Sequence, residues 1–267
     1  MKNYEELSFR DDFMFGKVME DKDLCRDVLS CLLQEDVGNL NELQTQSEFK
    51  YTADGKPIRL DVYNVDATGN IYDAEMQNLN KKNIESLQLP KRSRFYQSSM
   101  DVDFVDKGNS YKLLPNSTVL FICTFDPIGD GLSQYTFRES CVEKSGLYLQ
   151  DGTTKIFYNC TYTGADISDN LRKLYDYVLS GKTDNDLTKR IECAVNKGRK
   201  NAIWRTQYMK EWVIIQDARE EGGDIRDNER IRDMLHRGKS VDEIVDFCGY
   251  PFELVKKIED EMLAKAE

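Results

Sequence analysis

Three polar side chains with types and spacing suited to cation chemistry lie on two neighbouring runs of the sequence: Asp61 on the first run, Glu75 and Gln77 on the second. These runs, Ile58–Asp66 and Asn70–Gln77, are rich in β-branched and aromatic residues and are joined by a short polar segment that contains a glycine. The pattern predicts a β-hairpin. Because side chains alternate between the two faces of a strand, Glu75 and Gln77 share one face.

The length of the hairpin loop decides whether Asp61 joins that face. A two-residue loop, Thr68-Gly69, would place Asp61 opposite Met76, whereas a three-residue loop that begins at Ala67 would place it opposite Glu75. Three-residue loops need a left-handed residue at their third position, and glycine occupies that position here. The sequence therefore favours the loop that sets the two carboxylates opposite each other.

Opposed carboxylates on paired strands have Cβ atoms about 4.5–5.5 Å apart. At that separation each raises the pKa of the other unless a cation lies between them. Mg²⁺ accepts one or two protein carboxylates and keeps several waters, so Asp61 and Glu75 suit it. Spacing alone leaves a second interpretation open, a hairpin whose acidic residues simply face solvent.

Composition narrows the class of protein. The 267 residues are 40% hydrophobic, and no apolar run approaches the roughly 20 residues of a membrane helix. The first thirty residues are charged throughout, so we expect no export signal. The seven cysteines form an odd number without a C-x-x-C pair, and together with the expected lack of an export signal they predict reduced thiols in a cytoplasm. From the lack of a long apolar run we expect no contact with a membrane.

The charge distribution limits the chemistry further. A single histidine, His236, argues against histidine-based zinc sites and most serine or cysteine triads. The net charge of −11 argues against strong nonspecific DNA binding. Three basic clusters could still form a local groove or could be solvated helix faces: Lys81, Lys82, Lys91, Arg92 and Arg94; Lys197, Arg199, Lys200 and Arg205; Arg226, Arg230, Arg232, Arg237 and Lys239.

The expected elements follow the order α-β-β-β-α-β, which predicts an α/β fold with a mixed sheet flanked by helices. The helices expected are residues 10–34, with a break around Glu20–Asp23, then 79–100 with an interruption near Pro90, then 169–219. The strands expected besides the hairpin are Ser47–Thr52, Val119–Phe125, Gln134–Ser140 and Lys155–Tyr162, with residues 36–45 as a polar connection and 54–57 as a turn.

The last part of the chain is expected to form a separate unit. Glu221–Asp224 reads as a linker, which divides a main domain, residues 1–220, from a helical tail, residues 221–267. The small, turn and apolar positions of the tail are typical of a helix-turn-helix-like unit. Its second helix is acidic, which favours packing or a protein partner over contact with DNA.

Several of these motifs together resemble one known family. Asp61 on one strand with Glu75-Met76-Gln77 on the next, the segment Ser8–Met19 and the segment Leu89–Gln97 resemble the PD-(D/E)XK nuclease superfamily, in particular its recombination-promoting nuclease/transposase branch. The resemblance implies a restriction-endonuclease-like core and DNA cleavage that depends on Mg²⁺ or Mn²⁺, linked to recombination or mobile elements. Gln77 departs from the lysine that most of the superfamily carries, although this branch commonly has glutamine.

The resemblance also implies roles for individual residues. Asp61 and Glu75 would be catalytic metal ligands, Gln77 would orient the attacking water, and Asp12 would add a metal ligand from the first helix. Arg92-x-x-x-Tyr96 is similar to a Q-x-x-x-Y motif of related nucleases, so Arg92, Tyr96 and the nearby Arg94 would bind DNA.

Asp12 and the pair Arg92 and Tyr96 could instead have purely structural roles on their helices. Asp12 would be a carboxylate favoured by a helix start, and Arg92 with Tyr96 would be a surface pair. The second hypothesis for function is a catalytically weak nuclease-fold module that binds DNA or a protein partner. The sequence leaves open whether the chain forms a homo-oligomer.

Overall fold

The computed structural model describes residues 2–49, 58–78, 88–104 and 110–264, and these form two compact units, Lys2–Arg205 and Thr206–Glu267. The first unit contains η1 (Tyr4–Glu6), α1 (Asp12–Val18), α2 (Lys22–Leu33), β1 (Leu40–Phe49), β2 (Ile58–Asp66), β3 (Ile71–Gln77), α3 (Leu89–Phe104), η3 (Tyr111–Leu113), β4 (Ser117–Cys123), β5 (Gln134–Phe137), β6 (Thr153–Asn159), α4 (Asp169–Ser180) and α5 (Asp186–Arg199). The helix α6 (Ala202–His236) begins there, and α7 (Val241–Cys248) and α8 (Phe252–Ala264) follow it.

The described strands form one mixed sheet in the order β1-β2-β3-β4-β6-β5. The β1–β2, β2–β3 and β5–β6 pairs are antiparallel, and the β3–β4 and β4–β6 pairs are parallel. Every residue of β3 is buried, and β4 is nearly so, as the apolar run that begins at Val119 predicts for strands covered on both faces. The expected α/β fold is confirmed.

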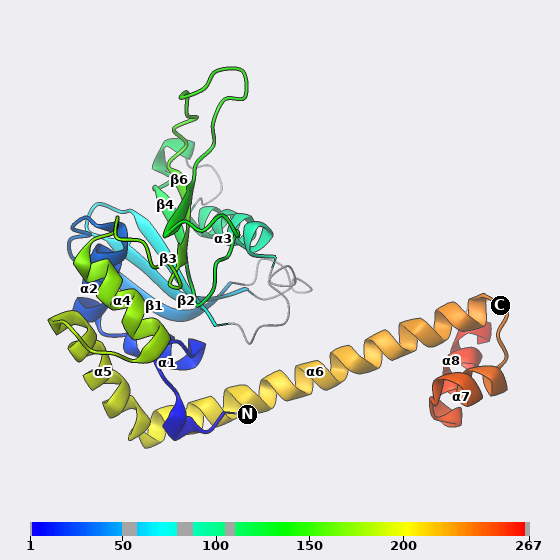
Figure 1. Ribbon diagram of the computed structural model, residues 1–267. Coiled ribbons are helices and arrows are strands. Elements are labelled where there is room, and N and C mark those ends of the chain that lie inside the picture. The colour runs from blue at the N-terminus through cyan, green and yellow to red at the C-terminus, as the bar shows by residue number, and fades with distance from the viewer. Residues whose placement is uncertain (1, 50–57, 79–87, 105–109, 265–267) are drawn as a thin grey trace. The chain divides into compact units, whose positions relative to one another are not determined.

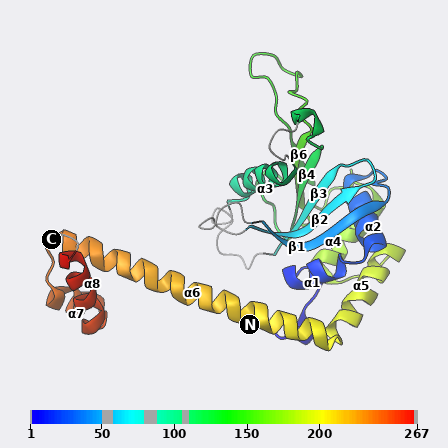
Figure 2. The ribbon, with the colours of Figure 1, turned by 180° about the vertical axis from the view of Figure 1, so that it is seen from behind.

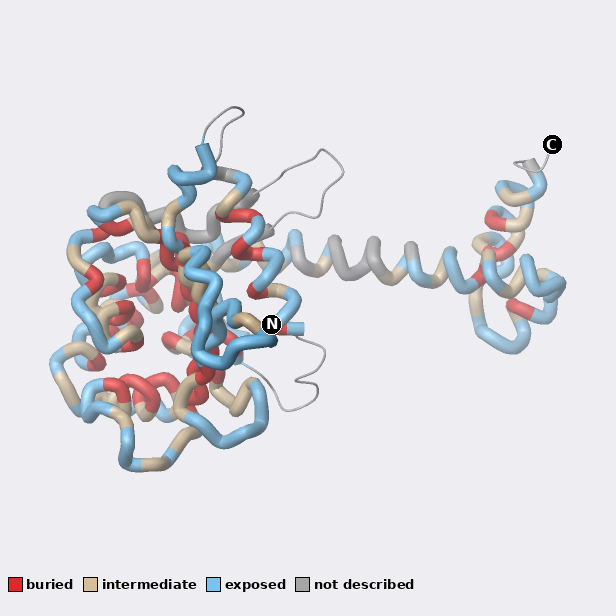
Figure 3. Tube along the Cα trace, turned by 90° about the horizontal axis from the view of Figure 1, so that it is seen from above, coloured by how far each residue is buried: buried red, intermediate tan, exposed pale blue. Residues whose placement is uncertain are grey.

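Helices cover the two faces of the sheet from opposite sides (Figures 1 and 2). On one face, Tyr96 and Met100 of α3 belong to a buried cluster that includes Val119 and Phe121 of β4. On the other face, the Asn64 amide of β2 donates to the Cys25 sulfur of α2 over 3.3 Å. Figure 3 shows the buried residues of this unit concentrated in the strands and in the helices packed on them.

The first helical region contains the predicted break. Helix α1 ends at Val18, and the Asp21 carboxylate accepts a hydrogen bond from the Leu24 N–H to cap α2. The polar connection expected over residues 36–45 is present only up to residue 39. From Leu40 the expectation was wrong, because β1 begins there and pairs with β2 from Leu40↔Asp66 to Phe49↔Ile58. This edge strand is largely polar, so it lacks the apolar alternation by which strands are found. The end of the expected strand at Thr52, the turn at 54–57 and the helical residues 79–87 lie outside the described residues.

The linker expected at Glu221–Asp224 was also wrong. Helix α6 runs through these residues without interruption, although each helical glycine costs about 1 kcal/mol relative to alanine. The boundary at residues 220 and 221 therefore stays a prediction, whereas the compact units divide after Arg205. In the unit Thr206–Glu267, α7 and α8 pack on the end of α6 through Ile231, Ile244, Val255 and Ile258.

The two last helices form the predicted helical hairpin. Gly249 ends α7 with φ of 71°, a left-handed conformation that favours glycine. Across the described ranges, no helix combines the length and apolar character needed to cross a bilayer.

Candidate active site

The hairpin of β2 and β3 has the three-residue loop that the sequence favoured. The Asp66 N–H donates to the Asn70 carbonyl over 3.0 Å, and Gly69 at the third loop position has φ of 89°. The Asp66 carboxylate accepts hydrogen bonds from the N–H groups of Thr68 and Asn70, which holds the turn. The register follows from this loop: Val62 pairs with Ala74, so Asp61 lies opposite Glu75.

The two carboxylates interact where the backbone ladder of the hairpin ends at Val62 and Ala74. The Asp61 N–H donates to Glu75 Oε1 over 3.0 Å, and the Met76 N–H donates to Asp61 Oδ2 over 3.2 Å. Each carboxylate thus binds the backbone of the opposite strand in place of a backbone carbonyl. This exchange fixes both side chains against one another on the face covered by α3.

Helix α3 places a cation over the acidic pair. Arg92 donates through Nη2 to Glu75 Oε2 over 3.2 Å and through Nη1 to Gln77 Oε1 over 3.0 Å. Its Nε and Nη2 also donate to the Tyr96 hydroxyl over 3.1 and 2.8 Å. The guanidinium lies 5.3 Å from the Tyr96 ring centroid and 5.6 Å from that of Phe121, within range of a cation–π interaction.

The position of Arg92 follows from how α3 packs. Arg92 and Tyr96 are one helical turn apart, so they share a face of α3. Gln97, the residue after Tyr96, donates through Nε2 to the Ser117 carbonyl over 2.9 Å, which ties α3 to the start of β4. The predicted pairing of Arg92 with Tyr96 is therefore present, and its cation reaches the acidic hairpin.

Electrostatics at the site favour a further positive charge. Glu75 is 2% exposed, and burial raises the pKa of its carboxyl, which the negative charges of Asp61 and Asp73 raise further. The Asp61 N–H and Arg92 oppose this shift. Burial and the charge of Asp61 likewise raise the pKa of Asp73 well above its usual value. Among the described residues, the carboxyl groups of Asp61, Asp73 and Glu75 thus lie close enough to affect one another, and Arg92 is a cation that acts on both Asp73 and Glu75.

Asp73 is the residue of this face that the sequence analysis did not single out. It lies two residues before Glu75, so the alternation that joins Glu75 to Gln77 places it on the same face. It is fully buried, and neither carboxylate oxygen has a hydrogen-bond partner among the described residues. The alternation of side chains along the strand is the signal that could identify it, although a lone acidic residue among apolar ones forms no motif of its own.

The chemistry of these donors fits a divalent cation. Carboxylate and amide oxygens from Asp61, Glu75 and Gln77 are the hard ligands that Mg²⁺ and Mn²⁺ prefer. The described residues contain no complete group of three His, Cys, Asp or Glu side chains arranged to hold an ion. Because Mg²⁺ keeps several waters, two carboxylates are enough to anchor it. The buried oxygens of Asp73, which accept no hydrogen bond from the described residues, add a further acidic group on the same face.

Two expected site residues lie away from this cluster. Asp12 is exposed at the first position of α1, which covers the face opposite α3, and its metal role stays a prediction. Arg94 is exposed on α3, beside the buried Ser93. Its DNA role also stays a prediction. Lys81 and Lys82 lie outside the described residues.

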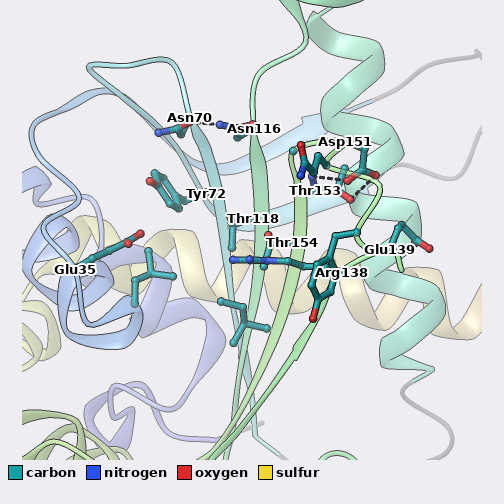
Figure 4. A pocket seen from close by; sticks show the side chains of 15 residues that line it. Glu35, Asn70, Tyr72, Asn116, Thr118, Arg138, Glu139, Asp151, Thr153 and Thr154 are labelled. Carbon is teal, nitrogen blue, oxygen red and sulfur yellow. Dashed lines mark hydrogen bonds between the residues drawn. The ribbon is translucent and has the colours of Figure 1, made fainter. Parts of the chain in front are cut away.

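A cavity of about 580 Å³ lies on the other face of the sheet (Figure 4). Tyr72, Thr118 and Thr154 line it, together with Glu35 and Arg138. Tyr72 alternates with Asp73 along β3, so the cavity is separated from the acidic pair by the sheet itself. We assign it no role, because it lacks opposed carboxylates and a buried side chain aimed into it without a partner.

Comparison with models of known protein families gives a match. Residues 7–157 match the family model described as PD-(D/E)XK nuclease family transposase, which spans more than half of the chain and contains all the residues of the acidic cluster. A search of curated proteins and a search of solved structures each found no match.

Proposed function

Because the chain belongs to the PD-(D/E)XK nuclease family transposases, we propose that it is a divalent-metal-dependent DNA endonuclease that acts in recombination or with mobile elements. The observation that carries this proposal is the carboxylate pair. The Glu75 carboxylate accepts a hydrogen bond from the Asp61 N–H, the Asp61 carboxylate accepts one from the Met76 N–H, and the Arg92 guanidinium donates to Glu75.

Asp61 and Glu75 would hold the ion, Mg²⁺ or Mn²⁺. When bound, the ion would polarise the scissile phosphodiester and lower the pKa of the attacking water. The protein contributes the fixed positions of the two carboxylates, which β2 and β3 set through the three-residue loop. Glu75 is almost fully buried, so its interaction with a cation is weakly screened by solvent.

Gln77 and Arg92 divide the role that a lysine has in most of the superfamily. Gln77 offers an amide donor and an acceptor to orient water but carries no charge. Arg92 supplies that charge from α3, and its planar fork can bind a phosphate through two parallel hydrogen bonds. Tyr96 holds the guanidinium in place through its hydroxyl. In this account Arg92 turns from Glu75 to the scissile phosphate when DNA binds.

The contact of Arg92 with the acidic hairpin favours a second candidate function. Arg92 already pairs with Glu75 and Gln77, and such a neutralised site suits a nuclease-fold module that binds DNA or a protein without cutting. The two functions differ in their need for a free Glu75. Only the nuclease requires that a divalent ion compete successfully with the guanidinium.

Nicking of supercoiled plasmid by the full chain separates the two functions. We expect Mg²⁺ or Mn²⁺ to produce nicked and linear DNA and EDTA to prevent it. A Glu75→Gln variant purified in parallel controls for a contaminating nuclease, because contamination would survive the substitution. Equal plasmid loss with parent and variant, or none with either ion, would favour the binding module.

A further inference from the structure

Asp73 sits in surroundings that do not suit a carboxylate. It pairs with Tyr63 on the neighbouring strand β2 and with Val119 on the neighbouring strand β4. Ile71, two residues earlier on β3, lies on the same face. These three neighbours belong to the buried cluster beneath α3. A carboxylate that is buried in such surroundings and accepts no hydrogen bond is unfavourable, so native proteins rarely keep one that has no role.

Asp66 of the same hairpin shows what a structural carboxylate looks like in this fold. It is also buried, at 4% exposure, yet its oxygens accept hydrogen bonds from Thr68, Asn70 and Tyr72. Asp73 has no such partner among the described residues. The contrast indicates that Asp73 is kept for something that binds to the protein rather than for the hairpin itself.

The charges nearest to Asp73 point to the acidic pair. Asp61 and Arg92 both act on its carboxyl, and Asp73 in turn acts on Glu75. On the strand face, Glu75 stands between Asp73 and Gln77, about 6.6 Å from each along β3. A cation held by Asp61 and Glu75 would therefore lie near the carboxylate of Asp73 as well.

We propose that Asp73 is a third acidic residue of the divalent-cation site, a positioning residue whose charge helps to hold the ion at Asp61 and Glu75. The inference rests on the proposed function and extends it to a residue that the family motif does not include. Along β3, Asp73 lies on the side of Glu75 that is away from Gln77 and from the end of the strand. Its negative charge would then draw the ion toward Glu75 against the competing guanidinium of Arg92.

Mn²⁺ binding by the full chain, measured by isothermal titration calorimetry without DNA, tests this inference. We expect Asp73→Asn to raise the Mn²⁺ dissociation constant by about tenfold or more. The reason is that the ion loses the attraction of one nearby negative charge, which is strong where the effective dielectric constant is low. Asp73→Leu has nearly the shape of the aspartate and suits the apolar neighbours, so it should fold and show the same loss. Asp66→Asn, the matched control on the same hairpin, should leave the Mn²⁺ dissociation constant unchanged.

A second readout uses stability. Saturating Mn²⁺ should raise the melting temperature of the parent more than that of either Asp73 variant, and both variants should be at least as stable as the parent in EDTA. Unchanged Mn²⁺ affinity in both variants would overturn the inference while the proposed function stood. Loss of folding in both variants would also overturn it, because Asp73 would then be structural. A parent that binds no Mn²⁺ would overturn the proposed function together with the inference.

Discussion

Arg92 donates to the Gln77 side chain over 3.0 Å, so a positive charge from α3 stands directly beside the one residue of the motif that carries none. The same guanidinium reaches Glu75, which places it between the metal-binding residues and the water-orienting residue of the proposed site. In most of the superfamily a lysine on the strand would bring this charge. Here Gln77 occupies that position on β3, and Arg92 brings the charge from α3.

This arrangement predicts how position 77 responds to lysine. Gln77→Lys alone would set an ammonium beside the Arg92 guanidinium, and the repulsion should lower plasmid cleavage. Arg92→Gln alone should lower it by roughly 10²–10³, because the transition state loses a charge in a poorly solvated site. The double variant restores one cation to the site and should cleave at least about tenfold faster than Arg92→Gln. If the double variant is no faster, Arg92 does not stand in for the lysine.

Arg92 should also compete with the metal. Removing its charge frees Glu75, so we expect Arg92→Gln to bind Mn²⁺ more tightly than the parent while it cleaves DNA more slowly. Titration calorimetry without DNA measures the affinity, and the nicking assay measures the rate. Arg92→Lys keeps the charge and is the matched control, which should bind Mn²⁺ about as the parent does. Weaker Mn²⁺ binding by Arg92→Gln would contradict this competition.

The loop carboxylate of Asp66 should matter for stability rather than for chemistry. It accepts hydrogen bonds from both backbone and side-chain donors of the turn, and Asp66→Ala would leave these donors unpaired. We expect a loss of about 2–4 kcal/mol in the free energy of unfolding, measured by urea denaturation in EDTA. A change within about 0.5 kcal/mol, the usual range for surface substitutions, would show that the turn does not depend on these bonds.

The register of the hairpin, the buried central strand and the acidic pair were readable from sequence for definite physical reasons. The glycine at the third loop position fixed the register that sets Asp61 opposite Glu75, and the apolar run from Val119 marked a strand buried on both faces. The contact of Arg92 with Gln77 was not readable, because it depends on where α3 packs on the sheet. The strand β1 was missed in part, because pairing with β2 and not apolar alternation makes it a strand.

Removal of residues 221–267 should leave the acidic cluster intact. The residues of the cluster and the elements that hold them all lie within Lys2–Arg205, which is compact on its own. We expect the shortened chain to be monodisperse, to melt cooperatively and to keep metal-dependent nicking. Aggregation of the shortened chain with exposed apolar surface would show that the tail completes the main unit.

The most direct test of the account is the rate of plasmid cleavage by Asp61→Asn and Glu75→Gln at one Mg²⁺ and one salt concentration, since DNA binding varies with salt. Both substitutions keep the size of the side chain and remove the charge that would hold the ion. Circular dichroism should show both variants folded, and Asp66→Asn serves as the control in which a carboxylate of the same hairpin is lost. The account predicts that both variants lose metal-dependent cleavage and that the control keeps it. Cleavage by either variant at the rate of the parent would contradict the assignment of the acidic pair as the metal site.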